Sequence, residues 1–505
     1  MAAPHPSEAL VPESVHVNAA HGPESPQARR IRNSAVFIPG FGGIPARSLP
    51  PNVFVLGTPG SGKTLLQQAI VASLRGAAQF GGLRHRALVV DYKNAWVEHL
   101  RAIGISGTQI VILNPFDARA SAIDFSRDFK SKADITALVQ FFLAGRQGVG
   151  GDGRFFDDAA SDIFHALILG CQQSGRTWGL ADIVAACSSI DALTRSLSST
   201  AAGRNAIAAY LEKSEPKLQK SVFATVKSLA ASVEPISSML RHAKTTISLD
   251  RWAEGGGVLV LGSHPRHREL LERYSNLIVE RISRLLLSRP EKNPLDESWL
   301  VIDELRATGK LPSIGDLLSA GREKGVRCFL GTQSIEGLID VYESESTALE
   351  IPALCDGKII LRQGSPKSRE YAASLFGERE ELYTQRSYNR GQTPDPTTGE
   401  FRESKGWSYA VQFATVPNVT ATQLDLPRAS PQTGLFGFSI LEHHWLPFWL
   451  HPNEVRELCF GPFRIDPVRD AGFFAWPDDQ AEPAEGVDRN QPGPSTQTRR
   501  GIVLS

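Results

Sequence analysis

The chain has 505 residues, of which 41% are hydrophobic and 21% are charged, as in an average soluble globular protein. Lys plus Arg and Asp plus Glu number 54 each, so global basicity gives no argument for nucleic acid, and any DNA contact must come from local sites. The five cysteines are scattered without the close pairs of a zinc site or a disulfide framework. We expect a cytoplasmic protein with several domains, or with one large domain that carries an insertion.

Short apolar runs that end in glycine or polar residues predict buried parallel strands. These runs are 52–56, 87–91, 109–113, 257–262, 299–303, 327–333 and 358–361. Between the third and fourth runs, residues 175–241 follow a helical pattern without a convincing strand, which indicates an all-helical insertion. The glycine cluster 145–153 marks a mobile loop, or a plain linker, before a helix that begins near Phe155.

One glycine-rich loop fits the phosphate-binding consensus G-x-x-x-x-G-K-[ST] at every fixed position. It follows the first strand and opens a helix, so a glycine turn that binds nothing is a weak alternative. Glycines let backbone N–H groups wrap phosphates at the positive end of the helix, while Lys63 spans the outer phosphate oxygens and Thr64 offers its hydroxyl to Mg²⁺. The loop consists of Gly57, Thr58, Pro59, Gly60, Ser61, Gly62, Lys63 and Thr64.

A second motif is the apolar strand 299–303, which ends in two adjacent carboxylates. Asp303 would hold the magnesium shell and Glu304 would polarise the attacking water. Paired acids at a strand end are common on surfaces, but together with the phosphate loop they indicate hydrolysis. No Asn-Lys-x-Asp guanine reader occurs, which favours ATP with Mg²⁺ over GTP.

Two further residues are candidates for the hydrolysis site. Gln333 ends a neighbouring strand and could sense the terminal phosphate, or could belong to an ordinary strand-end turn. Arg322 could face a neighbouring subunit's nucleotide as an arginine finger supplied in trans, or could be a solvated surface arginine.

These motifs resemble the TraD-type coupling proteins of type IV secretion and conjugation, relatives of the FtsK and HerA DNA motors. The similarity covers roughly residues 50 to 380 and is most specific around the acidic pair. The stretches that carry it are Glu297–Leu305, Gly309–Ser313, Leu317–Leu318, Gly321–Arg322, Gly331–Ser334, Asp91–Lys93, Ile112–Arg119 and the helix at Phe155.

The resemblance implies an α/β fold, a RecA-like P-loop NTPase with a mainly parallel central sheet flanked by helices, plus an all-α inserted domain. It also implies a homo-hexameric ring around a DNA channel. Residue by residue, Lys63 and Thr64 match the phosphate loop, Asp303 and Glu304 the acidic pair, Arg322 the trans arginine and Gln333 the sensor. The expected parts are a disordered segment 1–35, the motor domain in two pieces at 36–170 and 246–425, the insertion 171–245, a C-terminal extension 426–476 and a disordered tail 477–505.

Two features depart from the family pattern. Family members normally begin with membrane helices, whereas no run in this sequence reaches the length of a spanning helix. We therefore expect no intrinsic transmembrane anchor and a cytoplasmic location, or a peripheral one at the inner membrane through a partner. Arg306–Thr308 also follow the acidic pair where small or apolar residues are more usual. The sequence does not explain the function of the aromatic segment 434–450. It could be a packed segment, a docking segment or a contact with a membrane interface.

The first functional hypothesis is an ATP-driven DNA translocase or coupling ATPase, with secretion-channel or relaxosome proteins as further partners. A nucleotide-regulated protein-docking adaptor and a soluble DNA-processing ATPase of repair or defence are the alternatives. Basic residues of the insertion are candidate DNA contacts, although such side chains are more often a solvated helix face. They are Lys213, Lys217, Lys220, Lys227 and Arg241.

Overall fold

The computed structural model describes residues 35–45, 48–77, 85–144, 152–212, 215–290 and 297–454. The two segments expected to be disordered and the glycine cluster before Phe155 lie almost wholly outside these residues, and Lys213 lies outside them too. Within the described ranges, no helix is both long and apolar enough to cross a bilayer.

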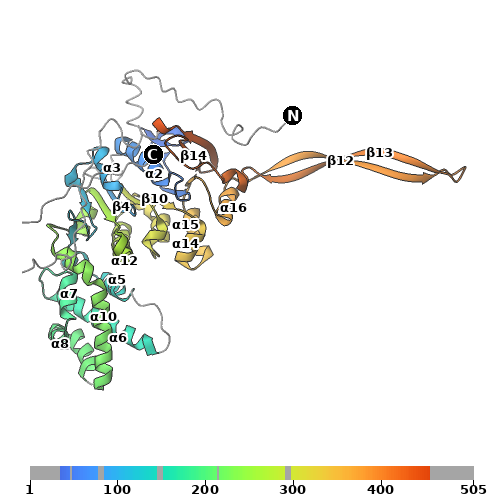
Figure 1. Cartoon of the computed structure of the whole chain (residues 1–505). Coiled ribbons are helices and arrows are strands. Elements are labelled where there is room, and N and C mark those ends of the chain that lie inside the picture. Colours follow the sequence, from blue (N-terminus) through green and yellow to red (C-terminus); the bar gives the residue numbers. More distant parts are fainter. Residues whose placement is uncertain are drawn as a thin grey trace, which may run out of the picture.

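A nine-stranded sheet forms the centre of the molecule, in the order β15-β14-β11-β3-β10-β9-β4-β8-β5 (Figure 1). The strands from β11 to β5 run parallel, and β14 and β15 are antiparallel additions at one edge. This confirms the expected α/β fold, and each predicted run forms a strand of the sheet. The strands are β3 (Asn52–Leu56), β4 (Arg86–Asp91), β5 (Ile110–Ile112), β8 (Gly257–Gly262), β9 (Ser298–Ile302), β10 (Val326–Thr332), β11 (Gly357–Ile360), β14 (Leu435–Leu441) and β15 (His444–Leu450).

Helices cover both faces of this sheet, which is why its parallel strands read as continuous apolar runs. Alternate residues of one strand enter different cores: Val53 and Val55 pack in one hydrophobic cluster, whereas Phe54 and Leu56 pack in the other. The elements packed around the sheet are β1 (Ala35–Ile38), β2 (Gly42–Pro45), α2 (Lys63–Ala77), α3 (Trp96–Ala102), α11 (Leu249–Glu254), α12 (Arg268–Leu287), α13 (Ile314–Ala320), α14 (Ile335–Tyr342), α15 (Glu345–Ala353) and α16 (Pro366–Ser374).

A lobe made only of helices extends from one side of the sheet (Figure 1). It lies between β6 (Ser121–Ile123) and β7 (Thr245–Ile247), two short parallel strands that pair at its neck. Its helices are α4 (Phe125–Asp128), α5 (Lys132–Leu143), α6 (Asp152–Gln173), α7 (Leu180–Ala186), α8 (Ile190–Ser198), α9 (Ala201–Ala206), η3 (Ile207–Glu212) and α10 (Pro216–Arg241). The helix expected near Phe155 is α6, and the domain boundary expected at residue 171 falls inside it, so the lobe includes helices that were assigned to the motor domain.

The neck of this lobe is held by buried polar contacts. Asp128 is buried and accepts hydrogen bonds from Ser248 Oγ and Leu249 N, both at 2.7 Å. Arg281 of α12 donates to Asp128 O at 2.6 Å and to Asp250 Oδ1 at 2.7 Å. These bonds join the first helix of the lobe to α11 and α12 of the main body.

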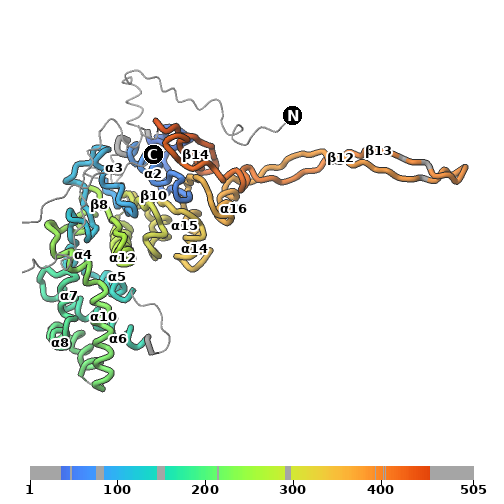
Figure 2. Tube along the Cα trace, in the orientation of Figure 1, coloured from blue at the N-terminus to red at the C-terminus, as the bar shows by residue number. Residues whose placement is uncertain are grey.

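Besides the short pairs β1–β2 and β6–β7, two larger β-structures have no counterpart among the strands expected from the sequence. The aromatic segment 434–450 forms β14 and β15, so part of the expected C-terminal extension completes the central sheet. Between β11 and β14, the chain makes a long two-stranded ribbon of β12 (Glu378–Pro394) and β13 (Phe401–Pro417). The ribbon projects away from the rest of the molecule (Figures 1 and 2).

Candidate nucleotide site

The glycine-rich loop joins β3 to α2 at the carboxyl edge of the sheet and is fastened to both neighbouring strands. Gly57 N donates to Thr332 O at 3.1 Å, and Thr58 N donates to Arg362 O at 3.0 Å. Gly62 has a φ of +87°, and a Cβ there would lie 2.1 Å from Leu435 Cδ1. Glycine is therefore required at 62 for both its backbone conformation and the space, and β14 helps to shape the loop.

Lys63 and Glu304 form a buried ion pair at the mouth of this loop. Lys63 Nζ donates to Glu304 Oε2 at 2.7 Å, and the two side chains are only 5% and 7% exposed. Burial lowers the pKa of the Lys63 ammonium, while the charge of Glu304 acts in the opposite direction. The sequence placed these residues 241 positions apart, and the fold brings them into contact.

Asp303 and Thr64 provide the oxygen atoms that a magnesium ion prefers. Thr64 Oγ1 donates to Asp303 Oδ1 at 2.7 Å. Asp303 is fully buried, and its Oδ2 makes no hydrogen bond within the described chain, although Lys93 Nζ lies 3.8 Å away. A buried carboxylate oxygen beside a hydroxyl fits a small divalent cation, and the metal role of these two residues stays a prediction.

Lys93 is a residue of the site that the motif reasoning did not select. It follows β4, and its Nζ donates to Thr64 Oγ1 at 2.7 Å. The sequence signal was present in Asp91–Lys93, which counted only toward the family resemblance. Lys93 therefore brings a second ammonium group to the two candidate magnesium ligands.

Asp91 holds the turn that positions Lys93. Its carboxylate accepts hydrogen bonds from the backbone N–H groups of Lys93, Ala95 and Trp96, at 2.7 to 3.2 Å. Burial raises the pKa of Asp91 to about 6, although these hydrogen bonds act in the opposite direction. Asp91 therefore has a structural role beside the site, and its burial favours the protonated form of the side chain.

Strand β10 lies between the loop strand β3 and the acidic strand β9. It brings Gln333 next to Glu304, but the contact is made by the backbone: Gln333 N donates to Glu304 Oε1 at 3.3 Å. Thr332 Oγ1 is 3.4 Å from the same oxygen. The Gln333 side chain is partly exposed and makes no hydrogen bond to the rest of the described chain, so its sensor role remains a prediction.

Arg322 lies away from the other candidates. It belongs to the short helix η6 (Gly321–Lys324), which precedes β10, and its side chain is exposed. The phosphate loop and the acidic pair follow their strands, so they occupy the opposite edge of the parallel sheet. Arg322 therefore cannot reach the site of its own chain, so it is either an arginine supplied to a neighbouring subunit or an ordinary surface arginine.

Gln363 is another residue that sequence reasoning missed. It follows β11, is fully buried, and donates through Nε2 to Leu56 O at 3.0 Å and to Leu361 O at 2.8 Å. These bonds tie the ends of β3 and β11 together directly behind the loop. A single glutamine after an apolar run carries no motif, so no sequence signal could have identified it.

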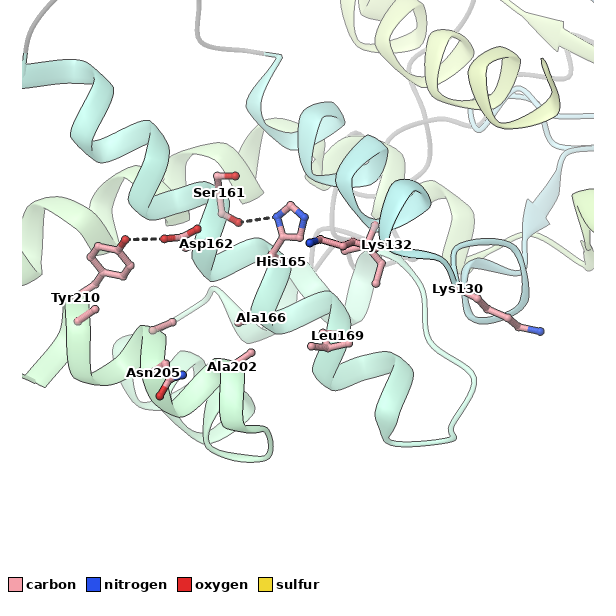
Figure 3. A pocket seen from close by; sticks show the side chains of 13 residues that line it. Lys130, Lys132, Ser161, Asp162, His165, Ala166, Leu169, Ala202, Asn205 and Tyr210 are labelled. Atoms are coloured by element: carbon pink, nitrogen blue, oxygen red, sulfur yellow. Dashed lines mark hydrogen bonds between the residues drawn. The ribbon is translucent and has the colours of Figure 1, made fainter. Parts of the chain in front are cut away.

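A separate cavity of about 750 Å³ lies in the helical lobe, between α6, α9 and η3 (Figure 3). His165 and Asp162 line it, and the Tyr210 hydroxyl donates to Asp162 Oδ2 at 2.6 Å. The helices that form it belong to the lobe, whereas the phosphate loop and the acidic pair belong to the central sheet. The cavity is therefore distinct from the nucleotide site.

The fold and the site define this chain as a nucleotide-binding protein of the P-loop class, in which one strand separates the loop strand from the acidic strand. Within that class, the chain belongs to the family of type IV secretion-system coupling proteins, because the model of their DNA-binding domain matches residues 37–429. This confirms the resemblance noted in the sequence.

Individual relatives agree with this assignment. The coupling protein TraD of Escherichia coli (strain K12) is 25% identical over 338 residues, which are 64% of this chain and 45% of TraD, so the chain spans less than half of that relative. The solved structure of the bacterial conjugative coupling protein TrwBdeltaN70, in its unbound monoclinic form, has a TM-score of 0.60 at 19% identity and covers 83% of this chain and 88% of its own. The plasmid coupling protein TrwB in complex with ADP and Mg²⁺ gives the same TM-score at 19% identity, over 88% of this chain and 92% of TrwB. At this identity the structures show a shared fold.

Proposed function

We propose that this chain is an ATP-hydrolysing motor that moves DNA, or a nucleoprotein, in the manner of a conjugative coupling protein. The observation that carries the proposal is the contact between Lys63 and Glu304, which holds a carboxylate beside the phosphate loop. A carboxylate in this position can accept the proton of an attacking water, which is the role of a general base.

ATP and Mg²⁺ are the proposed cofactors. The loop offers backbone N–H groups and a helix N-terminus to phosphates, and Asp303 with Thr64 would hold the ion. Bound Mg²⁺ supplies charge to the phosphate oxygens, and the chain orients the reacting groups around it. Support comes from the similarly folded TrwB, which has been solved with ADP and Mg²⁺ and with a non-hydrolysable ATP analogue.

DNA is the proposed substrate because the matching family is defined by a DNA-binding domain. The helical lobe offers one group of candidate contacts: Lys217, Lys220 and Lys227 are exposed and lie on one side of α10. Arg241 is also exposed, at the end of the same helix. Such a row of cations could follow a phosphate backbone.

Assembly as a homo-hexamer is part of the proposal, since Arg322 can serve a nucleotide only in a neighbouring copy. Secretion-channel or relaxosome proteins are the proposed further partners. We also propose a cytoplasmic location, or a peripheral one at the inner membrane through such a partner.

The proposal is tested by ATP hydrolysis of the purified chain with and without single-stranded and double-stranded DNA. Lys63→Ala and Glu304→Gln serve as the inactive controls. We expect DNA to stimulate hydrolysis, and we expect both substitutions to abolish it. Neutralising Lys217, Lys220 and Lys227 together should remove the stimulation, whereas Lys244→Ala, at an exposed position outside α10, should not.

A different outcome would favour a different class of protein. Hydrolysis that is indifferent to DNA would contradict the motor and favour the protein-docking adaptor. ATP binding without hydrolysis, in a preparation that forms the expected ring, would favour a nucleotide switch. DNA stimulation without any association with a secretion apparatus would favour a motor of DNA repair or defence.

A further inference from the structure

The ribbon of β12 and β13 has two chemically different faces. Paired residues of an antiparallel ribbon point to the same side, and the register joins Leu382 to Phe413, and Tyr388 to Trp407. Nearly all large apolar side chains of the ribbon therefore share one side, which we call the apolar face. It consists of Leu382, Tyr388, Phe401, Trp407, Tyr409, Val411 and Phe413, with exposures between 47% and 70%.

The opposite face is small and polar. Ser387 pairs with Ser408, and their hydroxyl oxygens are 2.7 Å apart. Asn389 pairs with Gly406 in the same way, and Tyr383 is the one large aromatic residue described on this side. Alternation of this kind is typical of a sheet with one solvated and one covered face. Nothing in the described part of this chain covers the apolar face, because the ribbon projects from the body (Figure 1).

We propose that the apolar face of the ribbon packs against the same face of a second copy of this chain. An isolated two-stranded ribbon is marginally stable in water, so a 17-residue pair of strands needs a further layer. The seven side chains expose roughly 100 Å² each, or about 700 Å² together, close to what one partner contributes to a stable interface.

The apolar surface of the remaining described chain cannot match this area. Outside the ribbon, the exposed large apolar side chains among the described residues are Phe155, Leu446 and Trp449. Two ribbons, in contrast, present equal areas, and at about 55 Å in length each can cover the other along its whole face. A symmetric pair formed in this way is self-complementary.

Charge also favours a second copy placed antiparallel to the first. On the apolar side of the ribbon, Glu378 and Glu380 lie at the base. Arg390 and Lys405 lie toward the tip on the same side, where both pair with Glu403 and leave a net charge of +1. An antiparallel pair places each basic tip half over the acidic base of its partner. Near the middle, the Arg386 guanidinium lies 3.7 Å from the centre of the Trp407 ring, which keeps this cation within the apolar face.

Nucleic acid is the less favoured occupant, although aromatic side chains can stack on bases. Residues 378–417 carry six acidic and five basic residues, a net charge of −1 that gives no electrostatic attraction for phosphates. The acidic residues are Glu378, Glu380, Glu381, Asp395, Glu400 and Glu403, and the basic ones are Arg379, Arg386, Arg390, Arg402 and Lys405.

The test measures the mass of the full chain by sedimentation velocity over a range of concentrations, without nucleotide or DNA. We expect the triple variant Trp407→Thr, Tyr409→Thr and Phe413→Thr to weaken association of two copies about a hundredfold. Tyr383→Thr, on the polar face, should behave as the unchanged chain. An unchanged association in the triple variant would overturn the proposal, and so would an equal loss with Tyr383→Thr.

A charge exchange keeps the apolar residues and tests the antiparallel placement. One variant carries Arg390→Glu and Lys405→Glu, and the other carries Glu378→Lys and Glu380→Lys. Each alone should associate weakly, because its own tip and base then have the same sign, whereas an equal mixture should form mixed pairs. Failure of the mixture to associate would contradict the antiparallel pair.

Single-stranded DNA is added in a final arm of the experiment. If the triple variant loses DNA binding while its association is unchanged, the apolar face binds nucleic acid and the proposal is wrong. Because the association is measured without ATP or DNA, its failure would leave the motor function untouched, and loss of hydrolysis would leave the ribbon pair untouched.

Discussion

Lys63 Nζ lies 2.7 Å from Glu304 Oε2, and both side chains are buried beside the phosphate loop. Removing one partner leaves the other as an uncompensated buried charge, so Lys63→Met should lower the free energy of unfolding by about 3–5 kcal/mol. The double variant Lys63→Met with Glu304→Gln carries neither charge and should recover most of this loss. Urea denaturation without nucleotide measures both values, and a double variant that simply adds the two single losses would show that the pair is not coupled.

Lys93 lies against Thr64 and Asp303, the same two residues that would hold the proposed magnesium ion. Because an ammonium group near these oxygens competes with a cation, Lys93→Met should lower the Mg²⁺ concentration needed for half-maximal nucleotide binding several-fold. A fluorescent ATP analogue at fixed concentration, titrated with Mg²⁺, gives this value. Lys93→Arg keeps the positive charge and should stay close to the unchanged chain. A higher Mg²⁺ requirement in Lys93→Met would instead indicate that the Lys93 ammonium group binds the phosphates of the nucleotide.

Asp91 should make the stability of the chain depend on pH. Its pKa of about 6 in the folded chain lies above the ordinary value of 3.8, so the folded state takes up the proton more readily than the unfolded state. The stabilisation that the protonated Asp91 gives to the folded chain is fully present below about pH 4 and is lost as the pH rises through about 6. The unfolding free energy of the unchanged chain minus that of Asp91→Asn should fall by about 3 kcal/mol across this window. An equal difference at pH 4 and pH 7, measured without nucleotide, would contradict the prediction.

Gly331 allows the end of β10 to approach the acidic pair. A Cβ at this position would lie 2.4 Å from Asp303 O, a backbone atom, and 2.9 Å from Gln67 Nε2. Gly331→Ala should therefore displace Asp303 and Glu304, lower the unfolding free energy by about 1–3 kcal/mol and reduce ATP hydrolysis more than tenfold. Gly315→Ala is the matched control, because a Cβ in α13 meets nothing within 4 Å. Equal hydrolysis by the two variants would show that the close approach at Gly331 is unimportant.

Arg322 can be tested by mixing two inactive variants. Arg322→Ala keeps an intact phosphate loop, and Lys63→Ala keeps the arginine. If Arg322 acts on a neighbouring subunit, each should hydrolyse ATP poorly alone, whereas a mixture should recover a measurable part of the activity. Steady-state hydrolysis before and after mixing decides the matter. A mixture no more active than the average of its components would assign Arg322 to the surface.

The sequence predicted the parallel strands and the phosphate loop well because both depend on local patterns. The apolar run 52–56 and the loop that follows it contain all the information needed to place Lys63. The pairing of the loop with the acidic strand end placed Glu304 in the same site, but it did not predict the direct contact between its carboxylate and Lys63. The contacts of Lys93 and Gln363 could not, because they depend on how strands distant in sequence are ordered within the sheet.

The ribbon was missed for a different physical reason. Residues 378–394 mix charged, polar and aromatic side chains without a clear period. Residues 407–413 do alternate large apolar with small or polar side chains, which is a strand signal, but this run has no recognisable partner strand in the sequence. The aromatic segment 434–450 was noticed but not assigned, because its function in the fold is to extend a sheet whose other members lie far away in sequence.

The pairing of β6 with β7 bears on how this chain could change over evolution. The chain leaves the body after Ile123 and returns at Thr245, which lies beside Ser121 in the register, so the two points are separated by no more than about 10 Å. An excursion that starts and finishes in one place can be lengthened, shortened or replaced without altering the sheet that supports it. The helical lobe could therefore change in length and surface while the sheet that carries the nucleotide site stays the same.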